Sequence, residues 1–284
     1  MLTIIIPTKQ SRIKPDCTAR LWSNLYRLTR HPAYDKGFCV WVADSSRYLG
    51  GIGLGLACLF WSAHYLKIAE KHRYYSPAQI KNYALKAVFD QGYSSHVLFL
   101  DVDVLLTDEF IDHVLGQVAK QVAFDWYPVD FLTKELDGRQ MQIYIDNKYL
   151  NQIPASKVLQ TGYSTGLQLL SQTFFEQTGG YDEHFVGYGC EDIELIHRAT
   201  AILGLRDSMQ ADSAYYQDDR GYDPSLLQGF RNYFYRLKQQ NPLPCRNPCH
   251  FWHVRKNDSN YLKNRKANDD KLLEIMREFD GKKL

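Results

Sequence analysis

The sequence lacks a hydrophobic run long enough to cross a membrane as a helix. Its most apolar window covers residues 49–63, whereas a spanning helix needs about 20 apolar residues. The window therefore predicts a core segment rather than a membrane span. The opening residues, MLTIIIPTKQ, contain neither a basic segment nor a small-residue cleavage site, so we expect no secretory signal peptide and a cytoplasmic protein.

The sequence also lacks a strong excess of charge of either sign. It has 34 Lys and Arg against 32 Asp and Glu, a net charge of +2, which gives no reason to expect nucleic acid as a partner. No repeat or low-complexity linker divides the 284 residues, and this length allows one large domain with a small appendage. Residues 221–284 are basic, with 13 Lys and Arg against 7 Asp and Glu. This stretch could contact an anionic inner membrane or could be a solvated basic face.

Six cysteines are present, and an even number is compatible with disulfides. Without a signal peptide, free thiols in a reducing cytosol are the better interpretation. The segment CRNPCHFWHVRK brings Cys245, Cys249, His250 and His253 together. Their spacing fits no common zinc finger. The alternative is that one imidazole of this segment completes a metal site built by carboxylates elsewhere.

The first half alternates buried strands with helices. Apolar runs at 2–8, 37–46 and 96–106 are typical of strands buried on both faces, and the patterns at 76–92 and 107–121 predict capped helices. Further strands are expected at 124–136 and 139–150, then a turn, a strand and a short helix within 161–180. This order predicts an α/β fold with a mostly parallel sheet. The strand ends at Pro7–Thr8, Asp44 and Asp101–Asp103 should share one edge, where ligands bind in such sheets.

Two aspartates interrupt an apolar strand in FLDVDVLL. In a regular strand, Asp101 and Asp103 would point to the same face. Two unpaired carboxylates there would repel each other and be costly to desolvate. A divalent cation resolves this conflict, and oxygen ligands suit Mg²⁺ or Mn²⁺. The alternative is that Asp103 and Asp108 only begin the next helix.

Three acidic residues follow a glycine-rich turn in GGYDEHFVGYGCEDIELIHRA. The segment EDIELIHRA predicts a helix in which Glu194 and Arg198 form an i,i+4 ion pair. Acidic residues are favoured in a first turn because they offset the helix dipole. A catalytic role for one carboxylate is the other interpretation, because the glycines let a ligand approach the backbone closely.

Taken together, these segments resemble GT-A glycosyltransferases that use nucleotide sugars. TIIIPTK and ADSS are similar to the first two strand ends of that fold, and FLDVDVLL to its metal-binding DxD motif. LLSQTFFEQTGGYDEHFVGYGCEDIELIHRA resembles the galactosyltransferase-type C-terminal module of β-1,4-galactosyltransferases, chondroitin-polymerase-like enzymes and polypeptide GalNAc transferases. HFWHVR is similar to the closing histidine motif. The resemblance implies a Rossmann-like central sheet flanked by helices. It also implies a transferase domain at 1–256, with a nucleotide-binding half at 1–105 and an acceptor-binding half at 106–256, before a basic helical extension at 257–284.

The resemblance also implies a role for individual residues. Asp192 matches the catalytic base of inverting members, and the acceptor site is expected at Glu191, Tyr188 and Gly189. The metal ligands are expected to be Asp103 and His253, with His250 as the alternative to His253. The residues expected to bind the nucleotide sugar are Pro7, Thr8, Asp44, Lys81, Asn82, Asp101 and Asp103. The usual WGWG of this module is VGYG here, so the sugar platform changes to Tyr188.

The resulting hypothesis is an inverting transferase that uses Mn²⁺ or Mg²⁺. It would move a hexose or N-acetylhexosamine, from UDP-Gal or UDP-GalNAc, onto a glycan or lipid-linked glycan acceptor. Bacterial capsule or lipopolysaccharide synthesis is the expected setting. Two alternatives stay open: a retaining GalNAc-type transferase, and a non-catalytic module on the same fold that binds nucleotides or carbohydrates.

Overall fold

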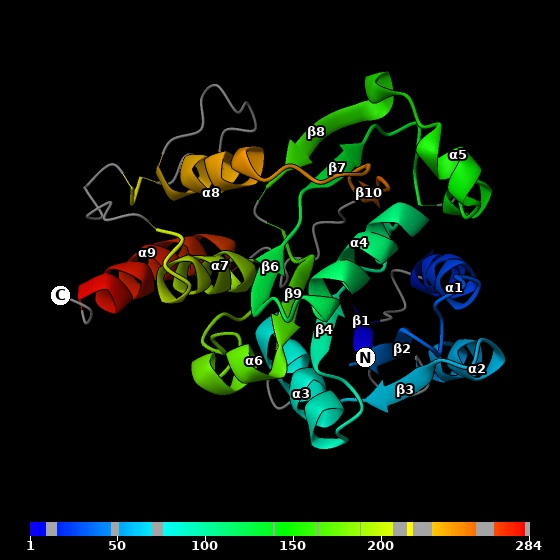
Figure 1. Ribbon diagram of the computed structural model, residues 1–284, viewed down its shortest axis with the longest axis horizontal. Coiled ribbons are helices and arrows are strands. Elements are labelled where there is room, and N and C mark those ends of the chain that lie inside the picture. Colours follow the sequence, from blue (N-terminus) through cyan, green and yellow to red (C-terminus); the bar gives the residue numbers. More distant parts are fainter. Residues whose placement is uncertain are drawn as a thin grey trace.

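The computed structural model describes residues 1–9, 16–46, 51–69, 76–138, 140–163, 165–187, 189–206, 215–217, 229–253 and 264–281. In this part of the chain a central sheet lies between two layers of helices, with a second, smaller sheet beside it (Figure 1). The fold class expected from the sequence, a central sheet flanked by helices, is confirmed.

The central sheet has the strand order β3-β2-β1-β4-β9-β6. Strands β3, β2, β1 and β4 are mutually parallel, whereas β9 is antiparallel to both of its neighbours. The bounds of these strands are β1 (Leu2–Thr8), β2 (Phe38–Asp44), β3 (His64–Lys67), β4 (His96–Phe99), β6 (Phe124–Trp126) and β9 (Gln168–Ser171).

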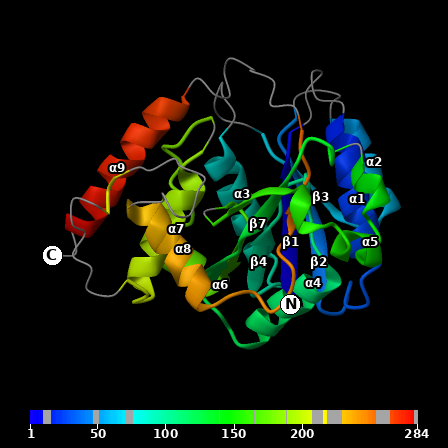
Figure 2. The ribbon, with the colours of Figure 1, turned by 90° about the horizontal axis from the view of Figure 1, so that it is seen from above.

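Alternating side chains of the central strands form two apolar clusters, one on each face. One face is covered by α3 (Pro77–Asp90), α6 (Gln172–Thr178), α7 (Glu191–Ile202), α8 (Gly229–Gln240) and α9 (Arg265–Gly281). The other is covered by α1 (Asp16–Thr29), α2 (Ile52–Phe60) and α4 (Asp108–Ala119). In Figure 2 these two groups of helices lie on opposite sides of β1 and β4.

The second sheet has the order β5-β10-β7-β8 and its own small core. Its strands are β5 (Val104–Leu105), β7 (Val129–Leu132), β8 (Val158–Gly162) and β10 (Cys249–His250). The short strand β10 lies between β5 and β7. The two sheets are therefore linked where the chain passes from β4 to β5.

The expected helix caps are confirmed for α3 and α4. Ser76 accepts a hydrogen bond from the Gln79 N–H with Pro77 in the first turn, and Thr107 does the same for the Phe110 N–H. The helix expected after Cys190 is confirmed as α7, and the expected strand and short helix within 161–180 are β9 and α6.

Two expected strands are wrong in detail. The run 96–106 is not one strand, because β4 ends at Phe99, residues 102 and 103 form a turn, and β5 begins at Val104. The segment expected as a strand at 139–150 instead forms a 3-10 turn, Gln140–Ile143, and the start of α5 (Asn147–Asn151). Asp146 explains the helix, because its carboxylate accepts the Lys148 N–H at 2.8 Å as an N-cap. A further 3-10 turn covers Ala155–Lys157.

The expected C-terminal helix is α9; residues 257–263 and 282–284 lie outside the described residues. Leu272 and Met276 of α9 join the same apolar cluster as Ile5, so this helix is part of the main core. The helix itself is not basic, since Arg265–Gly281 contains four Lys and Arg against five Asp and Glu. None of the helices in the described ranges has the length and apolar character of a membrane span.

Candidate active site

The parallel strands place the predicted site at one edge of the central sheet. Thr8 pairs with Asp44 at the ends of β1 and β2, and Ile5 pairs with Phe99 at the end of β4. This register confirms that Pro7–Thr8, Asp44 and the segment after β4 share one edge. The site residues of the second half reach the same edge, because β9 is antiparallel to β4 and begins there, with Leu169 opposite Leu98.

A polar stripe on α1 holds the turn that contains Asp101 and Asp103. Arg20, Asn24 and Arg27 are spaced by three or four residues, and all three are buried. Arg20 Nη1 donates to Asp103 Oδ2 at 3.1 Å, Asn24 Nδ2 donates to the Val102 carbonyl at 2.9 Å, and Arg27 donates to the Leu106 carbonyl. Both aspartates therefore lie in a turn fixed by α1, and not on a pleated strand.

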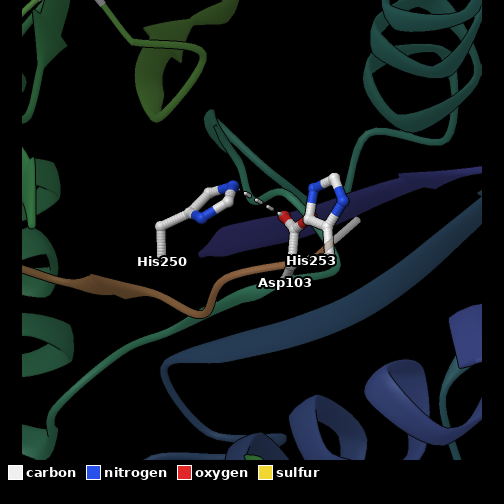
Figure 3. A group of neighbouring side chains, drawn as sticks. All are labelled: Asp103, His250 and His253. Atoms are coloured by element: carbon white, nitrogen blue, oxygen red, sulfur yellow. Dashed lines mark ion pairs between the residues drawn. The ribbon is translucent and has the colours of Figure 1, made fainter. Parts of the chain in front are cut away.

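Asp103 lies against both candidate histidines (Figure 3). His253 Nε2 is 2.8 Å from Asp103 Oδ2, and His250 Nε2 is 3.5 Å from Asp103 Oδ1. One ligand atom from each of the three residues lies within 4.8 Å of the other two. A carboxylate with two imidazoles is a donor set for a divalent transition metal. The chemistry of these residues therefore fits a metal ion of the kind that the sequence predicts.

The electrostatics of the two aspartates differ. Burial alone would raise the pKa of Asp103, but His250, His253 and Arg20 outweigh it and lower that pKa. Burial and the Asp103 carboxylate together raise the pKa of Asp101 to about 6, although one side of the residue stays open to solvent. Two further charges affect the pKa of Asp101: Lys81 lowers it and Asp192 raises it. Its pKa thus responds to charges in both the Asp103 cluster and the acidic start of α7.

Lys81 bridges the two acidic residues that begin α7. Its Nζ lies 3.2 Å from Glu191 Oε1 and 2.5 Å from Asp192 Oδ1, and also 4.8 Å from the centre of the Tyr181 ring. Burial would lower the pKa of Lys81, but Asp192 and Glu191 raise it well above its ordinary value. Burial and the charge of Asp192 raise the pKa of Glu191 to about 7. One cation thus orients both carboxylates.

The third acidic residue has a different environment. Glu194 is buried and forms a two-pronged ion pair with Arg198, at 2.5 and 2.9 Å. The same guanidinium donates to the carbonyls of Thr178 and Gly180. The predicted Glu194–Arg198 pair is therefore confirmed, and it ties α7 to the glycine turn rather than to the site.

The loop before α7 is held by α9. Gly187, Gly189 and Cys190 all have φ between 85° and 88°, the left-handed region that costs a non-glycine residue free energy. Asn268 Nδ2 donates to the Val186 carbonyl at 3.1 Å and to the Gly189 carbonyl at 3.3 Å. Cys190 Sγ lies 3.3 Å from Asp269 Oδ1. The C-terminal helix therefore fixes the backbone that delivers Glu191 and Asp192.

Other predicted site residues already have partners within the protein. Asp44 is fully buried and accepts hydrogen bonds from Ser46 N, the Tyr65 hydroxyl and Lys67 Nζ. Asn82 donates to the Tyr181 carbonyl and accepts from the Tyr181 N–H, both at 2.8 Å. Their roles in binding a nucleotide sugar stay predictions.

Two of the remaining predicted residues lie at the end of β1. Pro7 and Thr8 end β1, with the buried Thr8 hydroxyl 3.0 Å from Cys17 Sγ. Gly189 is part of the left-handed loop before α7. Tyr188 lies outside the described residues.

The cysteines take no part in the metal-ligand cluster of the described residues. Cys249 is buried on β10, and burial raises the pKa of its thiol to about 11. The cluster around Asp103 therefore follows the second interpretation of CRNPCHFWHVRK, in which imidazoles join a carboxylate.

A cavity of about 680 Å³ between β6 and the end of α8 is lined by none of the predicted site residues. Lys238, which lines it, pairs with Asp125 and lies 3.9 Å from the centre of the Trp126 ring. Lys238 lies in the segment RNYFYRLK at 231–238, which mixes basic and aromatic residues. Its charge is thus balanced within the protein.

The sequence analysis did not predict the role of Arg20, the counterion role of Lys81, or the contact of α9 with the loop before α7. The polar residues of α1 recur at helical spacing, but this pattern is also that of an ordinary solvated face. Nothing in the sequence connects α9 to the loop at 186–190, about 80 residues earlier.

The family model for glycosyltransferase like family 2 matches residues 60–277. The chain belongs to this family. A search of the curated proteins finds no match. Among solved structures, TarS of S. aureus has 15% identity and a TM-score of 0.45, with 70% of this chain and 33% of that chain covered.

Two further solved structures are similar over a comparable share of this chain. Glucosyl-3-phosphoglycerate synthase from Mycobacterium tuberculosis, solved with Mn²⁺ and UDP, has 16% identity and a TM-score of 0.43, covering 72% of this chain and 67% of that one. The mannosyltransferase PcManGT from Pyrobaculum calidifontis, solved with GDP-Man and Mn²⁺, has 18% identity and a TM-score of 0.42, covering 71% and 52%. This chain thus spans a third of TarS and about half of PcManGT.

Proposed function

We propose that this glycosyltransferase-family chain transfers a sugar from a nucleotide donor to an acceptor hydroxyl, with inversion at the anomeric carbon. The observation that carries the proposal is the pairing of two clusters at one sheet edge. One holds Asp103 with two histidines, and the other holds Asp192 and Glu191 on Lys81. Asp101 lies within the electrostatic reach of both.

The residues divide the chemistry between them. Asp192 accepts the proton of the acceptor hydroxyl as that oxygen forms its bond to the anomeric carbon and the bond from this carbon to the diphosphate breaks. Lys81 orients Asp192 and Glu191. A pKa of about 7 lets Glu191 either accept or donate a hydrogen bond to the acceptor at neutral pH.

Asp103, His250 and His253 would hold the divalent metal. When bound, such an ion neutralises negative charge on the departing diphosphate. Mixed oxygen and nitrogen ligands favour Mn²⁺ over Mg²⁺, which prefers oxygen alone. His253 lies closer to Asp103 than His250 does, which supports His253 as the stronger of the two ligands.

The substrates follow from the resemblance. UDP-Gal or UDP-GalNAc is the proposed donor, and a glycan or lipid-linked glycan the proposed acceptor, in bacterial capsule or lipopolysaccharide synthesis. Both neighbours described with manganese are also described with a nucleotide or nucleotide sugar.

A donor screen by release of nucleoside diphosphate, with Mn²⁺ or with EDTA, tests the proposal. We expect Mn²⁺-dependent turnover that Asp192→Asn lowers by about 10²–10⁴-fold, with donor affinity little changed. Asp103→Asn and His253→Ala should weaken Mn²⁺-dependent donor binding, and His250→Ala should weaken it less.

Four results would contradict parts of this proposal. Full turnover in EDTA that the Asp103→Asn variant also retains would show that the reaction does not need a metal ion. A larger loss from His250→Ala would reverse the order of the histidines. A product with the donor's anomeric configuration by NMR would point to the retaining alternative. Nucleotide binding without turnover of any donor would point to the non-catalytic module.

A further inference from the structure

Helix α2 carries a stripe of exposed apolar side chains. Ile52, Leu56, Leu59 and Phe60 recur at the spacing of one helix face and are 57%, 60%, 78% and 67% exposed. The opposite side, with Leu54, Ala57 and Cys58, packs into the core. Within the apolar window of the sequence, one face of α2 therefore packs in the core and the other face is exposed to solvent. An exposed apolar patch of this kind commonly marks an interaction surface.

Aromatic side chains continue the stripe at the C-terminal end of α2. The Phe60 ring lies 5.1 Å from Trp22 and 5.0 Å from Trp61, and Tyr26 lies 5.3 Å from Trp61. Trp and Tyr concentrate where a protein meets the boundary between lipid tails and water, because one part of each ring is apolar and another is polar. The patch therefore combines exposed aliphatic side chains with the aromatic residues that are favoured at a membrane interface.

The charges around the patch favour an anionic surface. Arg30 is exposed and lies 3.9 Å above the Tyr26 ring, beside the aromatic cluster. Residues 45–69 contain no Asp or Glu. Lys67 on the neighbouring β3 is half exposed but pairs with Asp44, so the positive charge next to the patch comes from Arg30. The only acidic residue on the adjoining turn is Asp35, which is followed by Lys36. Basic side chains next to an apolar face strengthen binding to anionic lipid.

The position and the size of the patch both favour a membrane over another protein as its partner. Figure 1 shows α2 at the outer end of the central sheet, beside the edge strand β3 and far from α8 and α9. Four side chains cannot supply the roughly 800 Å² per partner that a stable protein–protein interface buries. Partial insertion of a few apolar side chains into a bilayer has no such minimum area.

We propose that α2 docks the protein on a lipid bilayer that contains anionic lipid, with Ile52, Leu56, Leu59 and Phe60 entering the interface. This surface is distinct from the basic C-terminal residues, where the charge of α9 is not positive and Lys238 is paired. The proposal goes beyond the transferase activity and does not depend on it, because its readout is binding alone.

Co-sedimentation of the full chain with vesicles tests this proposal. We expect binding to phosphatidylcholine vesicles that contain phosphatidylglycerol, and weaker binding to phosphatidylcholine alone. The double variant Leu56→Glu, Leu59→Glu should reduce binding about tenfold or more, because both apolar side chains are replaced by charges repelled from the surface. The matched control is Leu159→Glu, since Leu159 is 68% exposed on β8.

Three results would overturn the proposal. The first is wild-type protein that sediments with neither vesicle. The second is equal binding by the wild type and the double variant. The third is a wild-type dimer by light scattering that the double variant converts to a monomer, which would assign this face to a second copy of the chain.

Discussion

At the scale of single residues, Gly166 makes the position of Asp192 possible. A Cβ at residue 166 would lie 2.9 Å from Asp192 Oδ2 and 3.4 Å from its Cγ. Carbon and oxygen atoms that do not hydrogen-bond avoid so short a distance. Asp192 cannot move freely away, because Lys81 holds Oδ1 and Gln168 donates to its backbone carbonyl.

We therefore expect Gly166→Ala to lower turnover by roughly 10–100-fold, because small displacements of a catalytic group are costly. Donor affinity should stay within about twofold, since the metal ligands are other residues. Steady-state rates and donor titrations check both quantities. Gly116→Ala in α4 is the matched control, because nothing lies within 4 Å of the added methyl group. Normal turnover in Gly166→Ala would mean that Asp192 need not occupy its observed position.

At the scale of secondary-structure elements, α9 acts on the site from outside it. The start of α9 holds the 186–190 loop through Asn268. The end of α9 is fixed by Asp280, which receives two hydrogen bonds from Arg206 at 2.9 and 2.6 Å. Leu272 and Met276 pack into the core between these two contacts. The helix can thus position the loop because it is itself anchored along its length.

Asn268→Asp should weaken acceptor binding and spare donor binding. A carboxylate in place of the amide would repel the Val186 and Gly189 carbonyls, and each lost hydrogen bond is worth about 1 kcal/mol. We expect the acceptor KM to rise roughly tenfold with the donor Kd unchanged. Asp270→Asn, on the exposed side of α9, is the control. A lower melting temperature with no change in acceptor KM would show that Asn268 has only a structural role.

The strand ends could be predicted at this scale, whereas the contacts between distant elements could not. Apolar runs ending at Thr8 and Asp44, with a third run that begins at His96, indicate parallel strands, and the shared edge follows from that geometry. The end of the third strand at Phe99 was not predicted. The turn at Asp101–Asp103 could not be predicted, because it depends on Arg20 and Asn24 of α1. Likewise the Glu194–Arg198 pair follows from helical spacing, but its burial depends on the glycine turn packed against it.

At the scale of the whole molecule, the apolar clusters join residues far apart in the sequence. One cluster contains Ile5, Phe99, Leu195 and Met276. The division expected at residues 105 and 256 stays a prediction, but the packing couples the two halves and the C-terminal helix. A change in the site can therefore alter the stability of the molecule as a whole, and Glu191 is the residue where this is measurable.

Burial and the neighbouring Asp192 raise the pKa of Glu191 to about 7, from an ordinary value of 4.5. Between these values the folded protein binds a proton that the unfolded chain has released. The free energy of unfolding contributed by this group is therefore present below about pH 4.5 and is lost as the pH rises through 7.

Glu191→Gln cannot titrate, so the variant should gain stability relative to the wild type between pH 5 and pH 8. The gain should be on the order of 1–3 kcal/mol. Urea unfolding at both pH values measures it, with the exposed Glu176→Gln as the control that should show no such change. A difference between Glu191→Gln and wild type that stays constant with pH would show that Glu191 is ionised throughout, so that Lys81 balances both carboxylates at once.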